Sequence, residues 1–410
     1  MVEEIDTVVI GGGQSGLAMS HHLSHAGRAH VVLERGRVAE RWHSQRWNSL
    51  RFQFPNWSVR LPGHQLVSNE PDAFSHYSAV AKFIGDYARI IKAPVRENTN
   101  VLGLRGGPEG KTYIVETEDG NLVARNVVIA TGPFQKPLIP DLGKNLPKGI
   151  FQIPATDYKS PDDLPQGAVL VIGSGASGCQ IADELNKVGR KTFLCASRHR
   201  RVPRRYRGKD MFWWFEALGR FNVNIDSFPN RQPPPSVVVT GIDGGYDVNL
   251  RDFAAEGGHL LGHLTSVADS TVSFASDVNH VLDGADQAYL DFIFAADELN
   301  LDDVEPLQNG VRFEPPNWPA LQTAEDLNLY SENITTVIWA TGHQYDFDWV
   351  HLPIFEPNGK PIQQRGVTSQ RGIYFLGLHW MHTFKSGILP FVGEDAAYIA
   401  NHLANMSGHL

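Results

Sequence analysis

Residues 7–16, Thr-Val-Val-Ile-Gly-Gly-Gly-Gln-Ser-Gly, determine the fold that this sequence predicts. The β-branched run before the glycines is typical of a buried parallel strand. Apolar residues from Leu17 to Ala26 then follow at roughly helical spacing. A second strand-like stretch, His30-Val31-Val32-Leu33, ends at Glu34. The sequence therefore predicts a strand, a glycine turn, a helix and a second strand, in that order.

The three glycines of the turn have separate physical tasks. Gly11 permits a tight turn, Gly13 lets the backbone approach a pyrophosphate, and Gly16 lets helix and strand pack closely. The start of the helix offers unpaired N–H groups and a positive dipole end to phosphates. Glu34, 18 residues beyond Gly16, can accept hydrogen bonds from ribose hydroxyls and would repel a 2′-phosphate. This turn is therefore expected to bind FAD or NAD.

The same pattern recurs from residue 168. An apolar run at 168–172 leads into Gly173-Ser174-Gly175-Ala176-Ser177-Gly178, a helical stretch follows, and a further strand is predicted at 192–197. Arg198 then stands where an acid would be expected, as the first of several basic residues. A guanidinium group matches a phosphate bidentately, so this exchange is typical of a site for a 2′-phosphate. We expect this turn to bind NADPH through the first one or two arginines, with the other basic residues on a solvated face.

Two nearly matching segments, Ala130-Thr131-Gly132 and Ala340-Thr341-Gly342, are predicted to be the points where the chain crosses between two nucleotide units. The simplest topology inserts the second unit into the first. The fold class is therefore α/β, with two Rossmann-like dinucleotide-binding domains. The FAD domain would comprise residues 1–150 and 331–410, and the NADPH domain residues 151–330.

Residues 203–330 are the least regular part of the chain. They lack clean hydrophobic periodicity, and Pro233-Pro234-Pro235 is typical of a loop. We expect a partly irregular, cap-like segment that helps to form the substrate cleft. Its aromatic run Phe212-Trp213-Trp214-Phe215 is expected to belong to the core. Earlier in the chain, residues 113–124 are predicted to form a hairpin.

The composition excludes several classes of protein. The 410 residues carry 36 Lys and Arg against 45 Asp and Glu, a formal charge of −9, which argues against nucleic-acid binding. Cys179 and Cys195 are too far apart in sequence for a Cys-x-x-Cys redox pair. The acidic start does not fit a signal peptide, and no run of about 18 apolar residues predicts a membrane span. We expect a soluble cytoplasmic protein, with homo-oligomerisation left open.

The ordered set of two glycine turns and two Ala-Thr-Gly segments resembles the class B flavin-dependent monooxygenase superfamily, over essentially the whole chain. That group includes the flavin-containing N- and S-oxygenating enzymes, the YUCCA-type enzymes and the Baeyer–Villiger monooxygenases. Its compact bacterial FAD- and NAD(P)-dependent oxidoreductases share further segments with this chain. These are Arg46-Trp47-Asn48-Ser49, Phe54-Pro55-Asn56-Trp57, Leu61-Pro62-Gly63, Tyr374-Phe375-Leu376-Gly377, His382-Thr383-Phe384-Lys385-Ser386-Gly387 and Gly393-Glu394-Asp395.

The resemblance implies an NADPH- and O2-dependent flavin monooxygenase that oxygenates a small organic substrate through a flavin C4a-hydroperoxide. Oxygenation would occur at nitrogen, sulfur or a carbonyl group. The flavin carries the difficult chemistry, and the protein must exclude water from it. Matching the segment around Trp47 to the family makes Gln53 and Asn48 the candidate catalytic residues, although either amide could equally satisfy a turn.

One departure from the family pattern lies ahead of the second glycine turn. The family fingerprint, Phe-x-Gly-x-x-x-His-x-x-x-Tyr/Trp, would place its histidine at Pro154. Tyr158 fits the last position, whereas Lys148 and Ile150 stand at the Phe and Gly positions. Because this fingerprint is associated with the linker that coordinates the two cofactors, the alternative function is an NADPH oxidoreductase that passes electrons to quinone or oxygen without oxygenating a substrate. A nucleotide-sensing regulatory subunit is the non-enzymatic alternative.

The expected cofactor contacts lie in the glycine turns, at the ends of the strands that follow them, in the Ala-Thr-Gly segments and in the C-terminal segment. They are Gly11, Gly13, Gln14, Ser15, Gly16, Glu34, Arg35, Trp42, Thr131, Gly132, Gly173, Gly175, Ala176, Ser177, Gly178, Ser197, Arg198, Arg201, Ala340, Thr341, Gly342 and Ser386. No metal site is expected, because His21, His22 and His25 lack an accompanying carboxylate or cysteine ligand set.

Overall fold

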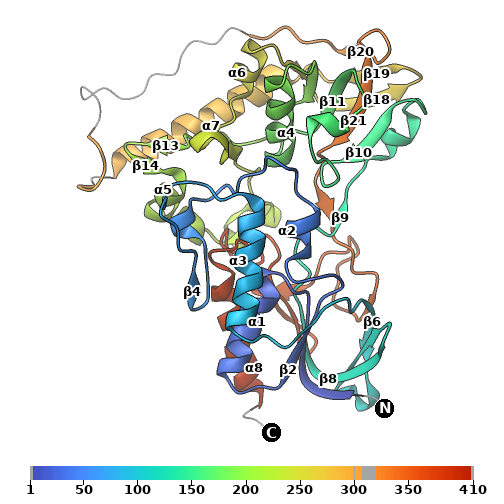
Figure 1. Ribbon diagram of the computed structural model, residues 1–410, viewed down its shortest axis with the longest axis vertical. Helices are drawn as coiled ribbons and strands as arrows, with labels where there is room; N and C mark the ends of the chain where they lie inside the picture. Colours follow the sequence, from blue (N-terminus) through green and yellow to red (C-terminus); the bar gives the residue numbers. More distant parts are fainter. Residues whose placement is uncertain (1–2, 300, 307–319, 408–410) are drawn as a thin grey trace.

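The computed structural model describes residues 3–299, 301–306 and 320–407. Within these ranges the chain forms two large sheets with helices packed on them. Figure 1 shows one sheet, with β1, β2 and β8, in the lower half of the molecule, and the other, with β10, β11 and β21, in the upper half. The fold is therefore mixed α/β, as expected.

The helices and strands have the following bounds. The helices are α1 (Gln14–His25), α2 (Glu40–Ser44), α3 (Tyr77–Ile90), α4 (Ala176–Lys187), α5 (Met211–Ala217), α6 (Leu250–Ala255), α7 (Val278–Glu298) and α8 (Val392–Ser407). The strands are β1 (Glu3–Ile10), β2 (His30–Leu33), β3 (Arg60–Leu61), β4 (His64–Gln65), β5 (Val95–Arg96), β6 (Val101–Gly106), β7 (Tyr113–Thr117), β8 (Gly120–Ile129), β9 (Lys136–Pro137), β10 (Phe151–Pro154), β11 (Ala168–Ile172), β12 (Thr192–Cys195), β13 (Arg205–Tyr206), β14 (Lys209–Asp210), β15 (Val239–Thr240), β16 (Tyr246–Asp247), β17 (His259–Leu261), β18 (Leu264–Ala268), β19 (Thr271–Phe274), β20 (Asp326–Asn328), β21 (Ile334–Trp339), β22 (His343–Gln344), β23 (Val350–His351), β24 (Gln363–Gln364), β25 (Val367–Thr368) and β26 (Ile373–Phe375).

The first sheet is built around β1, which pairs in parallel with β8 on one side and with β2 on the other. Val8 and Val9 are fully buried, and a strand covered on both faces has the uninterrupted apolar run seen in the sequence. The strand order is β23-β6-β7-β8-β1-β2-β5, and β26 joins through β8. α1 packs beside α8 (Figure 1). The predicted hairpin is confirmed as the antiparallel pair β7–β8.

The second sheet consists of five parallel strands in the order β10-β21-β11-β12-β17. All five residues of β11 are buried, again as expected for a central parallel strand. α4 follows β11 directly and returns the chain to β12, its neighbour in the sheet. The second strand–turn–helix–strand unit therefore forms where the sequence predicts it.

The chain passes between the sheets at the two Ala-Thr-Gly segments, as expected. Each segment leads into a short strand, β9 or β22, and these two strands pair antiparallel; Figure 1 shows β9 between the two halves of the molecule. The predicted boundary at residue 331 is wrong, because β21 lies in the second sheet between β10 and β11. The chain leaves the second sheet after β21 rather than before it.

The aromatic run in the irregular segment 203–330 is core, as expected. Phe212, Trp214 and Phe215 of α5 are buried and share a cluster with Phe292 of α7 and with Phe391 near the C-terminus. Residues 307–319 of this cap-like segment lie outside the described residues.

Among the helices that the structure describes, none is both long and apolar enough to cross a bilayer.

Candidate functional site

The first glycine turn joins β1 to α1, and its three glycines have different surroundings. Gly11 has a φ of +115°, and a Cβ there would lie 2.6 Å from the carbonyl oxygen of Ala130. A Cβ on Gly16 would lie 1.9 Å from the carbonyl oxygen of Gly11. At Gly13, by contrast, nothing lies within 4 Å of the Cβ position. Gly11 and Gly16 close the turn, while Gly13 leaves the backbone open to a phosphate.

The second glycine turn, between β11 and α4, repeats this geometry. A Cβ on Gly173 would lie 2.6 Å from the oxygen of Ala340, a Cβ on Gly178 would lie 1.9 Å from the oxygen of Gly173, and the Cβ position of Gly175 is open. Ala340 therefore stands against the second turn as Ala130 stands against the first. Neither helix has a side-chain cap at its N-terminus, so backbone N–H groups at both starts can bind an anion.

The two turns differ in the side chain that accepts a hydrogen bond from the backbone N–H of the turn's second residue. In the first turn, Glu34 accepts the N–H of Gly12 at 2.7 Å and the N–H of Gly36 at 3.0 Å. In the second turn, the Ser197 hydroxyl accepts the N–H of Ser174 at 3.2 Å. A hydroxyl thus replaces a carboxylate, and the second unit lacks the charge that would repel a 2′-phosphate.

The basic residues after Ser197 have contrasting environments. Arg198 is exposed and makes no hydrogen bond or ion pair with the residues that the structure describes. Arg201, expected at the cofactor, pairs instead with Asp247 at 2.8 Å and with Asp286 at 3.0 Å. Two carboxylates thus neutralise Arg201 within the protein.

The prediction of a solvated face for the later basic residues is wrong for Arg204. Its side chain is buried and pairs with Asp210 at 2.9 Å. Its Nη1 also donates to the backbone oxygen of Gln53 at 2.6 Å. Arg204 therefore ties the irregular segment to the segment that follows α2.

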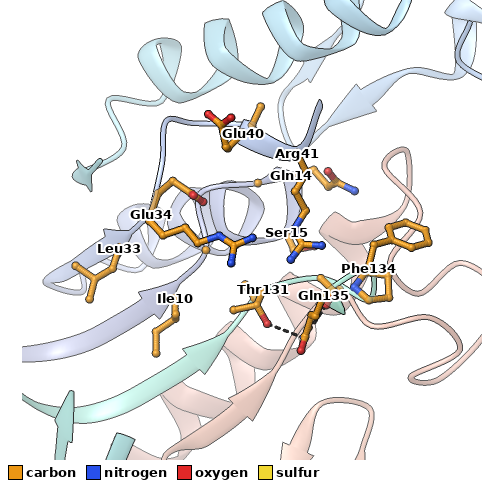
Figure 2. Close-up of a pocket in the computed structure, with 18 of the residues that line it drawn as sticks. Ile10, Gln14, Ser15, Leu33, Glu34, Glu40, Arg41, Thr131, Phe134 and Gln135 are labelled. Carbon is orange, nitrogen blue, oxygen red and sulfur yellow. Dashed lines mark hydrogen bonds between the residues drawn. The ribbon is translucent and has the colours of Figure 1, made fainter. Parts of the chain in front are cut away.

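A cavity of about 380 Å³ opens beside the first glycine turn. Figure 2 shows Glu34, Gln14, Ser15 and Thr131 around it, from the end of β2 to the first Ala-Thr-Gly segment. Nine of the expected contacts line this cavity: Gly11, Gly13, Gln14, Ser15, Glu34, Arg35, Trp42, Thr131 and Gly132.

Hydrogen bonds and close packing fix several of these cavity residues. Trp42 Nε1 donates to Gln14 Oε1 at 3.4 Å, and the Gln135 amide donates to Thr131 Oγ1 at 2.9 Å (Figure 2). A Cβ on Gly377 would lie 2.0 Å from Ser15 Oγ. The C-terminal segment therefore lies directly against the first turn of α1.

Sequence reasoning missed Arg41 and Arg46, which line the same cavity. Burial lowers the pKa of each guanidinium to about 10, so both remain charged at neutral pH. Arg46 lies over the Trp42 ring, 4.7 Å from its centroid. Arg46 begins the shared segment Arg46-Trp47-Asn48-Ser49, which could have indicated it, whereas the only signal for Arg41 is its place next to Trp42 in the sequence. Gln135, also missed, follows Thr131 and Gly132 closely.

The catalytic candidates Gln53 and Asn48 are not among the described residues that line this cavity. Gln53 is partly buried beside Arg204. Asn48 is exposed, and its backbone joins other segments through the oxygen of Lys159 and the ring of His76, at 2.8 Å each. Both residues thus make these hydrogen bonds through backbone atoms.

Several remaining expected contacts have structural partners. The buried Ser386 hydroxyl accepts the N–H of His382 at 3.1 Å, and Thr341 Oγ1 donates to the oxygen of Leu138. Ala176 and Ser177 form the first turn of α4. Gly342 directly precedes β22.

The fingerprint positions ahead of the second turn lie on and after β10. Pro154 pairs with Trp339 of β21. Tyr158 is fully buried, and its hydroxyl donates to Glu184 of α4 at 2.8 Å. The tyrosine position of the fingerprint is thus anchored on the second unit, whereas its histidine position offers no side-chain donor.

Sequence comparisons identify the family. A family model described as pyridine nucleotide-disulphide oxidoreductase matches residues 8–209. A protein of Geobacillus kaustophilus, named an uncharacterized CzcO-like oxidoreductase, is 32% identical over 98% of this chain and 99% of its own length. The chain belongs to the CzcO-like oxidoreductases. This CzcO-like chain is also 30% identical to the probable indole-3-pyruvate monooxygenase YUCCA1 of Arabidopsis thaliana, over 43% of the chain and 44% of that protein.

The fold has a counterpart among solved structures. A flavin-containing monooxygenase from Stenotrophomonas maltophilia matches with a TM-score of 0.68 and 19% identity, covering 99% of this chain and 100% of that one. The CzcO-like chain therefore has the fold of a flavin monooxygenase. The resemblance found in the sequence and the prediction of an oxidoreductase are confirmed.

The two cysteines of this CzcO-like oxidoreductase are not placed for disulfide chemistry. Cys179 lies on α4 and Cys195 on β12, and both are buried. Burial raises the pKa of both thiols, whereas a reactive cysteine needs a stabilised thiolate.

Proposed function

We propose that the chain is an FAD- and NADPH-dependent monooxygenase that uses O2 to oxygenate a small organic substrate at nitrogen, sulfur or a carbonyl group. The pair of matched glycine turns carries the proposal, because the turns share their backbone geometry and differ in one group. Glu34 suits the ribose of FAD, and Ser197 with Arg198 suits the 2′-phosphate of NADPH. Similar proteins named flavin-containing monooxygenase and probable indole-3-pyruvate monooxygenase support the reaction class.

The residues of the first cavity fit FAD. The open Cβ position of Gly13 leaves room for a pyrophosphate beside the uncapped start of α1. Each oxygen of Glu34 accepts one backbone N–H and keeps a lone pair for a ribose hydroxyl. Trp42 and Phe134 offer apolar surface farther along the cavity.

The second turn offers the corresponding groups to NADPH. Gly175 leaves its backbone open beside the start of α4, and the exposed Arg198 follows the neutral Ser197. We propose that the two sheets carry one dinucleotide each, joined by the β9–β22 pair. Both Ala-Thr-Gly segments, which stand against the turns, lead into this pair.

A bound flavin would supply hydride acceptance from NADPH and reaction with O2. The chain itself binds, orients and shields the reactants. Phe54 packs on Phe212 with ring centroids 4.9 Å apart, and Phe212 stacks on Phe391 at 5.6 Å. This aromatic packing between the two units would keep water out of the reaction site. Gln53, next to Phe54, is our candidate for an amide that contacts the reacting atoms, with Asn48 as the alternative.

Pro154 favours a second candidate function, an NADPH oxidoreductase that reduces quinone or oxygen and oxygenates no substrate. Proline offers neither a side-chain donor nor a titratable group where the family fingerprint has histidine.

The test measures how NADPH oxidation is coupled to product formation. FAD-loaded protein is mixed with NADPH, isotopically labelled O2 and a panel of amines, sulfides and ketones, and both peroxide and labelled product are quantified. The proposal expects one labelled oxygen atom in the product of at least one substrate, with little peroxide. Stoichiometric peroxide with every substrate, together with fast quinone reduction, would contradict it and favour the second candidate.

A further inference from the structure

Arg41 places a guanidinium group in the first cavity without a protein acceptor for one of its nitrogens. Its side chain extends from α2 toward Gln14 and Ser15 at the start of α1 (Figure 2). Its Nη1 is buried and makes no hydrogen bond to any residue that the structure describes. A buried donor without an acceptor destabilises a protein. We therefore expect a ligand to supply the acceptor for this nitrogen.

Arg46 and His343 lie close enough to Arg41 for its charge to lower the pKa of each. Arg46 lines the cavity, and Arg41 adds to the lowering of its pKa that burial causes. Burial lowers the pKa of His343, and the charges of both arginines add to this effect. The His343 ring packs on Phe134, a cavity residue, with centroids 5.2 Å apart. Its Nε2 is also buried without a hydrogen-bond partner among the described residues.

The acids that line the cavity offset this cluster only in part: the charge of Glu34 raises the pKa of Arg41, against the larger lowering by burial and by the charge of Arg35. Glu34 accepts two backbone N–H groups, and Glu40 pairs with the exposed Arg37 at 2.9 Å. Asp346 is not among the charges that shift the pKa of either arginine.

We infer that Arg41, Arg46 and His343 form an oxyanion-binding subsite of this cavity. A guanidinium group pairs its N–H donors with two oxygens of a phosphate or a carboxylate. The neutral imidazole can add one N–H donor. Two positive charges in a partly buried site bind an anion more strongly than a surface pair would, because the surroundings are less polar than water.

The oxyanion has two sources that share this chemistry. One is the diphosphate of the dinucleotide, which would meet Arg41 beside the start of α1. The other is a carboxylate of the substrate, which would be bound after the flavin. The carboxylate source rests on the proposed function, whereas the diphosphate source requires only that the cavity binds an ADP group.

The experiment uses pairs of ligands that differ in charge but little in shape. Dissociation constants for ADP and adenosine are measured on FAD-free full-length protein, and those for benzoate and benzamide on FAD-loaded protein. The variants are Arg41→Gln, Arg46→Gln, His343→Phe and Arg41→Lys, with Arg37→Gln as the matched control. Arg37 is exposed in the same segment and does not line the cavity. Circular dichroism and the melting temperature establish that each variant is folded.

If the subsite exists, Arg41→Gln and Arg46→Gln should raise the dissociation constant of ADP or of benzoate at least tenfold. The dissociation constant of the matching neutral ligand, adenosine or benzamide, should change less than twofold. Loss of ADP assigns the subsite to the diphosphate, and loss of benzoate assigns it to a substrate carboxylate. If Arg41→Gln does not fold, Arg41→Lys serves in its place. Because lysine keeps the charge, this variant should retain part of the ADP or benzoate binding. His343→Phe should cause a smaller loss, because it removes only one neutral donor.

Three results would overturn the inference. They are unchanged binding of both anions in all variants, equal losses for charged and neutral ligands, and an equal loss in Arg37→Gln. ADP binding requires neither NADPH nor O2. The subsite can therefore stand if the protein oxygenates nothing, and it can fail while oxygenation is observed.

Discussion

Arg198 and Arg201 are three positions apart and have opposite environments. Arg198 is exposed, whereas Arg201 pairs with Asp247 and Asp286. We expect Arg198→Ala to weaken NADPH binding by about 1.5–3 kcal/mol, the value of a charged hydrogen bond, and to leave NADH binding unchanged. Steady-state KM values for both nucleotides measure this. Lys191→Ala, which removes an exposed charge directly before β12, is the control, and equal losses for NADPH and NADH would contradict the assignment.

His21 should make stability depend on pH. Burial lowers the pKa of His21 to about 4 from 6.5, and the charges of His25 and His22 add to this effect. Because the unfolded chain binds this proton more readily, the stabilisation is complete above pH 6.5 and is lost as the pH falls toward 4. We expect His21→Asn to lose less stability than the wild type between neutral pH and pH 5 in urea unfolding. His351→Asn, an exposed histidine, should behave as the wild type does.

Single residues were predictable from sequence where the backbone itself imposes the requirement. Gly11 and Gly173 lie at positive φ against a carbonyl. Because these positions require glycine, the spacing of the Gly-x-Gly-x-x-Gly motif predicts them. The role of Arg201 was not predictable, because its partners lie 46 and 85 positions away in the sequence. Arg41 was missed because an arginine in a helix as short as α2 has no local pattern that distinguishes a cavity side chain from a solvated one.

At the scale of the strand–turn–helix element, the third and second glycines of each turn separate stability from binding. We expect Gly16→Ala to destabilise the protein by about 3 kcal/mol or more, because its Cβ would meet the oxygen of Gly11 at 1.9 Å. Gly13→Ala should leave the melting temperature of FAD-free protein unchanged and weaken FAD, because its Cβ enters open space that the phosphate would occupy. Calorimetry and the flavin content measure the two effects. Equal destabilisation by both substitutions would contradict this distinction.

The parallel strands were predictable because burial on both faces leaves an apolar run, as in β1 and β11. The short strands of the irregular segment were not, because pairs such as β13–β14 and β15–β16 span two residues per strand. Such short pairs are stabilised by tertiary contacts rather than by a local pattern. The sheet to which β21 belongs also depends on partners far along the chain, which explains the wrong boundary at residue 331.

At the scale of the whole molecule, an aromatic cluster joins the irregular segment to the C-terminal part of the first unit. Phe391 is 3% exposed and packs on Phe212 and Phe221. We expect Phe391→Ala to cost about 3–5 kcal/mol of unfolding free energy and to raise the share of NADPH electrons released as peroxide. Urea unfolding and a peroxide assay measure these effects. Tyr398→Ala, on a more exposed face of α8, is the control, and destabilisation without any added peroxide would show that the cluster does not shield the reaction.

We propose that one chain binds FAD at its first glycine turn and NADPH at its second, close enough for hydride transfer. The decisive measurement is rapid mixing of oxygen-free, FAD-loaded protein with one equivalent of NADPH. The flavin absorbance should bleach in a single turnover, and Gly175→Leu, which fills the open position of the second turn, should slow bleaching without releasing FAD. A protein that binds both dinucleotides but leaves the flavin oxidised would contradict the claim.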